Sequence, residues 1–384
     1  MNIQIVSASL PPEHDGIADY TAQLAAELAT RVRVKVLTAK GLEPTLIPGT
    51  VIEQFFSIAD TRSTRNLTHV IGLDKPDWLL LQYNPFCYGR WGLNLSLPLA
   101  IREIKMRWPE VGIAVMVHEP FVPVTSWQFA LMTIWQRWQL WMLGRSADVM
   151  FLSIETWARK FQRWFPNRPV RHLPVGSAIP REPLSRGEAR QLLGIKDCTL
   201  VIGVFGTAHS SHLLDYVGGA VNEVTKRFAD VLILYIGPHG TQVQAAMPTV
   251  TLVDAGYLAP ADVSRHFAAM DIYLAPFLDG VSTRRTSFMV GLQHGIPTVS
   301  TVGFLTDEVL LKEQDKAFLL APVGTPGAFT AQVLRLAQDA ELRTHLGEAG
   351  KHLYDSTFSW DHIADRLLQV FREAKQQVDP RIHS

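Results

Sequence analysis

The chain has 384 residues, which is too long for one ordinary hydrophobic core and predicts about two domains. Hydrophobic residues make up 47% of the sequence, so an intrinsically disordered protein is excluded. Lys plus Arg and Asp plus Glu both number 36, so no overall field attracts nucleic acid or an anionic membrane, and any basic site must be local.

The cysteines and the N-terminal residues indicate the compartment. Cys87 and Cys198 lack metal or redox spacing, which points to a reducing environment without a disulfide framework. Met1 leads into a short apolar run rather than a signal peptide, and no apolar segment approaches the ~20 residues that span a bilayer. We therefore expect a soluble cytoplasmic protein.

Short apolar runs alternate with amphipathic helical segments along the whole chain. In the first half the runs are NIQIVSAS, VRVKVLT, WLLLQYN, IAVMVHE and ADVMFLSI. In the second half they are LVIGVFG, VLILYIG, VTLVDAGYL, DIYLAPF, TVSTVG and AFLLAPV. Continuous β-branched runs between helices are typical of parallel sheets that are buried on both faces. The two series therefore predict two doubly wound α/β domains.

A segment rich in proline and polar residues, VRHLPVGSAIPREPLSRGEAR, separates the two series and is typical of a linker. It predicts a first domain at 1–178 and a second at 179–359. The last predicted helix, 360–377, has no strand after it and is free to pack elsewhere.

Ligands of doubly wound sheets bind outside the carboxyl ends of the strands, which directs attention to two loops of the first domain. The first loop places Gly16 at a helix start, where glycine lets a ligand approach the backbone and free N–H groups face an anion. A tight turn explains this glycine equally well, and the loop lacks a GxGxxG dinucleotide fingerprint. VMVHEPF puts His118 at the same edge, although a lone histidine is more often structural.

In the second domain, the loop after LVIGVFG contains His209 and His212, and Ser210 or Ser211 there could cap the next helix. The alternative for both histidines is a solvated position near that cap.

The stretch DGVSTRRTSFMVGLQHGIP predicts a helix that is capped by Ser282 or Thr283 and ends before Gly295. Its first turn would then carry Arg284 and Arg285, where the helix dipole disfavours each cation by roughly 0.3–1 kcal/mol. A bound anion would relieve this cost. The alternative is a set of surface ion pairs with neighbouring carboxylates.

Tryptophans crowd the predicted helix at 126–148. They are Trp127, Trp135, Trp138 and Trp141. The sequence favours a helix that packs on the sheet, because surface helices bury an apolar stripe. Amphipathic tryptophans also suit a peripheral contact with the inner membrane, which would bring the protein to a lipid-linked acceptor.

Taken together, these segments resemble the glycosyltransferases of the GT-B fold, most closely the retaining family 4 enzymes. PPEHDGIADYTAQLAAELA is similar to the family's glycine loop, VMVHEPF to its active-site histidine segment, and VDAGYLAPADVSRHFAAMDIYLAPF with HGIPTVST to its nucleotide-sugar segment. The resemblance covers nearly the whole chain. It implies two Rossmann-like domains facing a cleft, with FSWDHIADRLLQVF crossing back, so that 360–384 joins the first domain.

The resemblance also implies roles for residues. Gly16 and His118 would contact the donor, and Tyr257 would lie beside the base. Arg284, Arg285 and the N–H groups near Thr286 and Ser287 would stabilise the departing diphosphate, because guanidinium groups bind phosphate bidentately.

The implied reaction is hexosyl transfer from a nucleotide sugar with retention of configuration and without a covalent enzyme intermediate. The sequence contains no Asp-x-Asp motif or cluster with metal-ligand spacing, so we expect no metal and no cofactor beyond the donor substrate.

Two departures from the family pattern stand out. Ser282 and Val290 occupy the positions of the family's paired glutamates, so ribose recognition is open. His209 and His212 stand roughly where the family has an arginine and a lysine. A related subset of the family carries the version with two adjacent arginines, which favours variation over loss of activity.

Two other functions remain as alternatives: a non-catalytic subunit that binds a nucleotide sugar, and a GT-B-like sugar-nucleotide epimerase. The acceptor is a sugar, a small molecule or a lipid-linked sugar, and no nucleic-acid partner is expected. The sequence identifies neither the donor base and sugar nor the oligomeric state.

Overall fold

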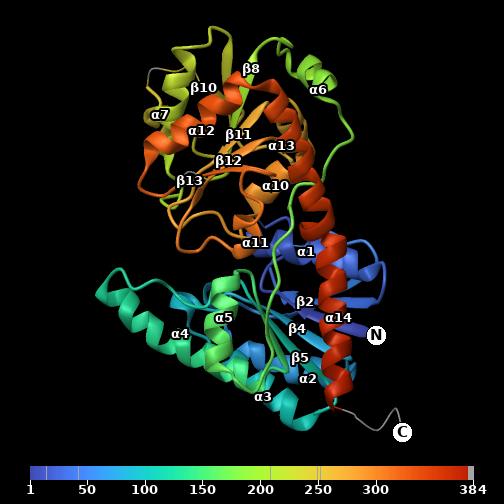
Figure 1. The fold of residues 1–384 in the computed structure, drawn as a ribbon. Helices are drawn as coiled ribbons and strands as arrows, with labels where there is room; N and C mark the ends of the chain where they lie inside the picture. Colours follow the sequence, from blue (N-terminus) through green and yellow to red (C-terminus); the bar gives the residue numbers. More distant parts are fainter. Residues whose placement is uncertain (14, 42, 208, 249, 251, 379–384) are drawn as a thin grey trace. The chain divides into compact units, whose positions relative to one another are not determined.

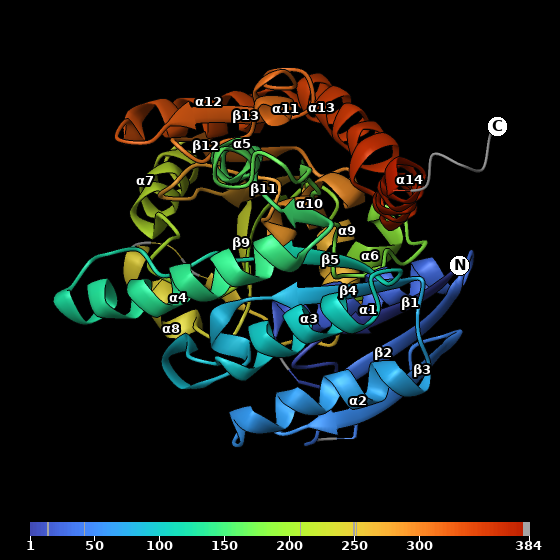
Figure 2. The same cartoon turned by 90° about the horizontal axis from the view of Figure 1, so that it is seen from below.

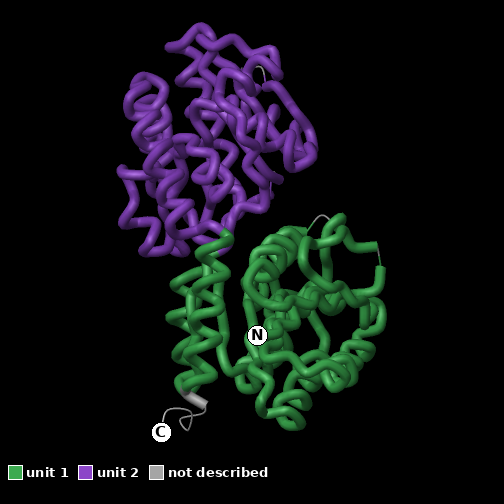
Figure 3. Tube along the Cα trace, turned by 90° about the vertical axis from the view of Figure 1, so that its right-hand side faces the viewer, with its two compact units in different colours: residues 1–174, 360–384 green, residues 175–359 purple. Residues whose placement is uncertain are grey.

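The computed structural model describes residues 1–378 except 14, 42, 208, 249 and 251 (Figure 1). The chain divides into two compact units, coloured separately in Figure 3. Unit 1 contains residues 1–174 and 360–384, and unit 2 contains residues 175–359. The boundary after Pro174 lies a few residues before the predicted one at 178.

Unit 1 is built on a parallel sheet with the strand order β3-β2-β1-β4-β5-β6-β7. Its strands are β1 (Asn2–Val6), β2 (Arg33–Ala39), β3 (Thr50–Phe56), β4 (Trp78–Tyr83), β5 (Gly112–Val117), β6 (Val149–Leu152) and β7 (Val170–His172). Its α-helices are α1 (Gly16–Ala29), α2 (Asn66–Leu73), α3 (Ser96–Arg107), α4 (Trp127–Ser146), α5 (Glu155–Trp164) and α14 (Trp360–Val378).

Helices cover both faces of this sheet. One apolar core joins the strands to α2, α3, α4 and α5, and the first three of these helices lie together in Figure 2. On the other face α14 packs against α1. The middle strands β4 and β5 are buried at every residue, whereas the edge strand β3 is partly exposed. This is the burial expected of a parallel sheet between two helical layers.

Unit 2 repeats the plan with the order β10-β9-β8-β11-β12-β13, again parallel. Its strands are β8 (Leu200–Phe205), β9 (Val231–Ile236), β10 (Leu252–Asp254), β11 (Ile272–Ala275), β12 (Thr298–Val302) and β13 (Leu319–Pro322). Its α-helices are α6 (Arg186–Leu193), α7 (Leu214–Thr225), α8 (Gly240–Ala246), α9 (Pro260–Ala268), α10 (Thr286–His294), α11 (Glu308–Leu311), α12 (Pro326–Gln338) and α13 (Ala340–Leu353). Separate cores on the two faces join the sheet to α7 and α12, and to α9 and α10.

The predicted runs form strands in both units, and the predicted fold class is confirmed. Two strands escaped prediction. β3 is an edge strand with mixed burial, so it lacks a continuous apolar run. β7 has three residues and lies inside the segment predicted as linker, which also contains the first five residues of α6.

The prediction that the helix at 126–148 packs on the sheet is confirmed for α4, but three of its four tryptophans do not lie on the buried side. Trp127, Trp138 and Trp141 are exposed by 72%, 43% and 45%. The helix packs on the sheet through Leu140 and Leu143, which are fully buried, and its remaining buried positions are mostly polar. The physical reason is the set of hydrogen bonds that these polar side chains make, which is described below.

The last helix, α14, is fixed to unit 1 by an aromatic stack. Phe371 is fully buried, and its ring lies parallel to that of Trp78 on β4, with centroids 4.1 Å apart. At the end of the helix, Lys375 pairs with Asp77 at 2.7 Å. The chain therefore returns to unit 1 through contacts that are specific to this helix.

Replacing Phe371 by Ala should lower the free energy of unfolding by ~3–5 kcal/mol, because a buried ring leaves a cavity against Trp78. Chemical denaturation followed by near-UV circular dichroism measures this change. Arg372→Ala, at the exposed neighbouring position, is the control and should change stability little. Equal denaturation midpoints for the two variants would show that the stack does not hold α14.

Candidate functional site

The strand order reverses direction at one place in each sheet, between β1 and β4 in unit 1 and between β8 and β11 in unit 2. Ligands of open α/β sheets bind outside the carboxyl ends of the strands at such a point. In unit 2 the two loops at the reversal are 206–213 and 276–285. These loops contain His209, His212, Arg284 and Arg285, so topology gathers candidates that are far apart in sequence.

Backbone hydrogen bonds join these two loops. Leu213 N donates to Pro276 O at 3.1 Å, and Leu278 N donates to Ser211 O at 2.8 Å. Between them, His212 and Phe277 form an isolated antiparallel bridge. The side chains that follow β8 are therefore held in a fixed register beside those that follow β11.

The ring of Phe277 contacts one side chain from each loop. Its side chain is fully buried. The imidazole of His212 meets the ring edge-on, with centroids 5.0 Å apart, and the Arg285 guanidinium lies 4.4 Å above the ring centroid. A guanidinium at this distance is attracted by the ring quadrupole. We call Phe277, His212, Arg285 and Ser211 the Phe277 cluster.

Arg285 is the charged centre of the Phe277 cluster. Its side chain is 15% exposed, Nη1 is 3.5 Å from Ser211 Oγ, and Nη2 is 4.0 Å from Asp279 Oδ2. The first distance is long for a hydrogen bond, and the second is long for an ion pair. Burial, followed by the charge of Arg285 and then by His209, lowers the pKa of His212 to about 4. His212 is therefore neutral at physiological pH, and Arg285 supplies the positive charge.

The predicted helix start is wrong. α10 begins at Thr286, Arg285 is its N-cap residue, and no side chain caps it. Thr283 lies three residues before this start, and its N–H and Oγ1 both donate to Oδ2 of buried Asp307, each at 2.7 Å. The arginines thus precede the helix, and Thr286 and Ser287 supply its first N–H groups, which lack carbonyl acceptors within the helix. The predicted end is confirmed, with Gly295 in the left-handed conformation.

The loop before α10 is fixed at several points. Gly280 has φ +83°, and a Cβ at this position would lie 2.2 Å from Gly303 N, so only glycine fits. Leu305 N donates to Asp279 O at 3.0 Å, and Val281 N to Thr301 O at 2.8 Å. Such a loop holds its arginines in place before a ligand arrives, which is the arrangement that electrostatic catalysis requires.

The other candidates of unit 2 lie apart from the Phe277 cluster or at its border. His209 is exposed, with Nδ1 3.1 Å from Ser211 Oγ. The predicted serine cap is wrong, because α7 begins after Leu213 with no side-chain cap. Tyr257 follows the edge strand β10 and is 64% exposed.

In unit 1, His118 follows β5 and lies against α1. Its Nε2 is 2.8 Å from Gln82 Oε1, and the ring of Tyr20 meets it edge-on with centroids 4.7 Å apart. Burial lowers the pKa of His118 to about 3. With the glutamine oxygen accepting, the neutral imidazole carries its proton on Nε2, and such a weak base is suited to hydrogen bonding rather than to proton abstraction.

Gly16 is the first residue of α1, the helix that also carries Tyr20. Asp15 caps this helix by accepting from Ile17 N at 3.2 Å, and Ser9 Oγ donates to the Asp15 carboxylate at 2.7 Å. A Cβ at position 16 would meet nothing within 4 Å, and Gly16 is not among the glycines with positive φ. Neither a tight turn nor crowding therefore requires glycine here.

Three residues of these sites were missed by the sequence analysis. Gln82 had a signal, because it is a single polar residue in the wholly buried strand β4. The sequence carries no signal for the contacts of Asp307 and Phe277, because each lies at the edge of an apolar segment and their partners are distant in sequence. Ser282 and Val290, at the family's glutamate positions, are each only 1% exposed, which leaves the ribose without an obvious partner there.

Among the described residues, no group of three or more His, Cys, Asp and Glu side chains is placed to hold a metal ion. Within the same residues, no helix is both long and apolar enough to cross a membrane.

Comparison with known proteins identifies the fold. No family model matches the chain. A curated relative, spore coat protein SA of Bacillus subtilis (strain 168), is 20% identical over 203 residues, which are 49% of this chain. The match spans 52% of the relative, about half its length.

Solved structures match nearly the whole chain. Sucrose-phosphate synthase from Thermosynechococcus elongatus has a TM-score of 0.75 at 14% identity, covering 98% of this chain and 100% of its own. HepE from Anabaena, in complex with UDP and glucose, has a TM-score of 0.71 at 11% identity, covering 97% and 100%. A UDP-N-acetylglucosamine 2-epimerase from Listeria monocytogenes, described as putative, has a TM-score of 0.63 at 12% identity, covering 98% and 97%. The chain therefore has the two-domain GT-B fold that sucrose-phosphate synthase and HepE share.

The depressed pKa of His118 predicts a pH dependence of stability. In the unfolded chain a histidine binds a proton below its ordinary pKa of 6.5, whereas native His118 stays neutral until about pH 3. The unfolded state thus binds more protons in this window, so the free energy of unfolding should fall as pH drops, by at most ~1.4 kcal/mol per pH unit for this histidine. The contribution of His118 to the free energy of unfolding is therefore fully present above about pH 6.5 and is lost as the pH falls toward 3.

Urea denaturation of the protein and of His118→Asn between about pH 7 and pH 5 measures this dependence. The variant should lose less stability on acidification, because it lacks one of the protons taken up on unfolding. His69→Asn, on the exposed surface of α2, is the matched control and should keep the full slope. If the free energy of unfolding falls with pH by the same amount in all three proteins, His118 is not buried in the neutral state.

Proposed function

We propose that the protein transfers a sugar from a nucleotide-sugar donor to an acceptor, with retention of configuration and without a metal ion. The observation that carries this proposal is the Phe277 cluster beside the start of α10. It provides a fixed cation at the strand reversal of unit 2, where a diphosphate would bind. The fold shared with glycosyltransferases, including HepE with bound UDP and glucose, supports this assignment.

In the proposed reaction the sugar–phosphate bond breaks, and negative charge develops on the leaving diphosphate. Arg284 and Arg285 would receive this charge, together with the N–H groups of Thr286 and Ser287. Guanidinium groups bind phosphate oxygens in pairs and stay charged, so they can serve without a metal ion. Because the loop is already fixed, little reorganisation accompanies the charge shift.

The residues of unit 1 have a different proposed role. Neutral His118, whose Nε2 proton is donated to Gln82, would accept a hydrogen bond at Nδ1 from a hydroxyl of the transferred sugar. Gly16 would let the sugar or phosphate approach the start of α1. The acceptor would attack from the face that the diphosphate leaves, without a covalent enzyme intermediate. We assign Tyr257 to the base and His209 to the border of the diphosphate site.

For the acceptor we propose a sugar, a small molecule or a lipid-linked sugar. The proposed location is cytoplasmic, with peripheral contact to the inner membrane for a lipid-linked acceptor.

An epimerase is the second candidate, because the Listeria monocytogenes protein has the same fold. Incubation with a nucleotide sugar and no added acceptor distinguishes these functions: an epimerase converts the sugar and keeps it on the nucleotide, whereas a transferase releases nucleoside diphosphate and free sugar by slow transfer of the sugar to water. A binding subunit without catalysis would do neither. The donor for this assay is found by screening nucleotide sugars for thermal stabilisation. Turnover that survives a chelator of divalent cations would support metal independence, and loss of turnover would contradict it.

Replacing Arg285 by Ala should weaken nucleoside diphosphate binding by ~1.5–3 kcal/mol, the range of hydrogen bonds to charged groups. Binding of the nucleoside alone should hardly change, because the lost contact is with phosphate. Calorimetric titration measures both affinities. We expect a smaller loss for Arg284→Ala, because Arg285 is the residue seated on Phe277.

Arg265→Ala, on the outer surface of α9 in the same unit, is the control and should leave both affinities unchanged. If Arg285→Ala also leaves diphosphate affinity unchanged, the diphosphate does not bind at the Phe277 cluster.

Replacing His118 by Ala should lower turnover by about ten-fold or more, equivalent to ~1.4 kcal/mol, while nucleoside diphosphate affinity stays nearly the same. The reason is that His118 belongs to unit 1 and the proposed diphosphate site to unit 2. His69→Ala controls for the loss of a histidine. A matching loss of diphosphate affinity would refute this division of roles.

A further inference from the structure

Helix α4 buries several polar side chains and exposes large apolar ones. The positions that face the protein include Thr133, Gln136 and Gln139, which are 3%, 0% and 2% exposed. The outward positions include six large apolar side chains, which are those of Trp127, Phe129, Leu131, Ile134, Trp138 and Trp141, beside exposed Gln128, Arg137 and Arg145. An ordinary surface helix shows the opposite pattern, because water solvates polar side chains better than apolar ones.

The buried glutamines explain why the helix adopts this orientation. Gln139 Oε1 accepts from Asn94 N at 2.6 Å, and its Nε2 donates to Gly92 O at 2.7 Å. Gln136 Oε1 accepts from Val122 N at 2.9 Å. These bonds satisfy backbone groups of the segments beside α4, so the helix cannot rotate without leaving buried polar groups unpaired. The apolar side is therefore held outward.

The apolar surface extends beyond the helix. Trp91, Leu93 and Leu95 are exposed by 61%, 42% and 45%, and Val124 before α4 by 60%. The segment with Trp91 is tied to α4 by the Trp135 Nε1 bond to Trp91 O at 3.1 Å. We call these residues and the outward side chains of α4 the α4 face. Single exposed apolar residues are common on proteins, but ten on two segments that are tied together indicate an interaction surface.

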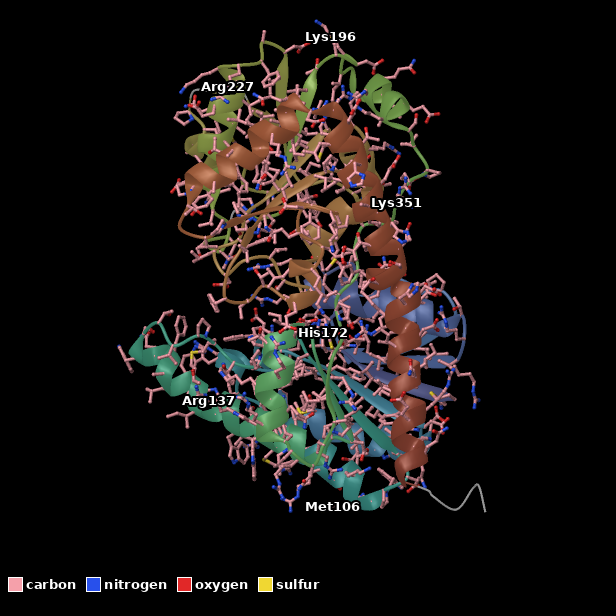
Figure 4. The ribbon with its side chains drawn as sticks, in the orientation of Figure 1. Met106, Arg137, His172, Lys196, Arg227 and Lys351 are labelled. Atoms are coloured by element: carbon pink, nitrogen blue, oxygen red, sulfur yellow. The ribbon has the colours of Figure 1, made fainter. Side chains whose placement is uncertain are left out.

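The charges around the α4 face are mostly positive. Residues 120–147 contain no Asp or Glu, and residues 120–168 contain six basic and two acidic side chains in a chain whose net charge is zero. Arg145 lies over the Trp141 ring at 5.1 Å, and Arg90 over the Trp91 ring at 5.0 Å. Figure 4 labels Arg137 on the same helix, where its guanidinium lies 4.8 Å from the Phe121 ring centroid. Arginine guanidinium groups therefore lie against the exposed rings of Trp141 and Trp91.

We propose that the α4 face docks on the surface of an anionic lipid bilayer. Tryptophans beside arginines match the boundary between acyl chains and anionic headgroups, where rings are buried and guanidinium groups meet phosphate. A second copy of the chain fits less well, since a two-fold interface would bring this basic surface against itself. Within unit 1, the N-terminal half of α4 reaches beyond the strands of the sheet in both views (Figures 1 and 2).

The test is sedimentation of the purified protein with vesicles of phosphatidylcholine that contain about a third phosphatidylglycerol, at low salt. The protein should bind these vesicles, and binding should weaken at high salt and on pure phosphatidylcholine, because headgroup charge is screened or absent. The triple variant Trp127→Ser, Ile134→Ser, Trp138→Ser should lower the partition coefficient by about ten-fold or more, and so should the pair Arg137→Glu, Arg145→Glu.

Two variants with matched chemistry serve as controls. Leu73→Ser removes an apolar side chain that is 75% exposed at the end of α2, and Lys196→Glu reverses an exposed charge in unit 2. Both should bind vesicles as the unchanged protein does. Circular dichroism of every variant shows whether the fold is kept.

Absence of vesicle binding at low salt would overturn the proposal, and so would equal binding by the triple variant. Sedimentation equilibrium without lipid identifies the competing occupant: a dimer that the triple variant abolishes would assign the α4 face to a second copy. The proposal does not depend on the transferase function, because the vesicle assay contains no donor. Failure of donor turnover would leave the vesicle result unchanged.

Discussion

The pairing of two loops through Phe277 is the constraint on which the candidate site of unit 2 depends. The residue is bound on its backbone side by Thr301, whose Oγ1 accepts from Phe277 N at 2.8 Å and donates to Phe277 O at 2.6 Å. Its ring then supports His212 from one loop and Arg285 from the other. An apolar side chain therefore sets the positions of the polar ones, and the parallel strands β8 and β11 bring it to the sheet reversal.

The same region concentrates positive charge at the start of a helix, where the backbone already exposes N–H groups. Such an arrangement is unfavourable by itself and becomes favourable when an anion binds. Buried Asp307 contributes to it indirectly, since its hydrogen bonds to Thr283 fix the loop that carries both arginines. Unit 1 has the opposite character: His118 is neutral, held by Gln82 and Tyr20, and suited to a hydroxyl group rather than to a phosphate.

The sequence predicted the elements that depend on local pattern. The apolar runs of both sheets and the glycine end of α10 were readable because burial and backbone conformation act on neighbouring residues. The sequence did not predict the features that depend on partners distant in the chain. The start of α10 was misplaced, in a loop where Thr283 bonds a carboxylate 24 positions away, and the outward orientation of the α4 tryptophans was not predicted, because the glutamines of this helix bind the 91–94 segment. The site residues were found individually, but their assembly on Phe277 required the structure.

The central claim is that the loop before α10 binds a diphosphate. A crystal structure of the full chain with a nucleoside diphosphate tests it most directly. The account predicts phosphate oxygens within hydrogen-bonding distance of the Arg285 guanidinium and of the N–H groups of Thr286 and Ser287, with the ring of Phe277 unmoved beneath the arginine. A diphosphate bound elsewhere in unit 2, such as the 440 Å³ pocket lined by Arg181 and Arg343, with the Phe277 cluster unchanged, would contradict it.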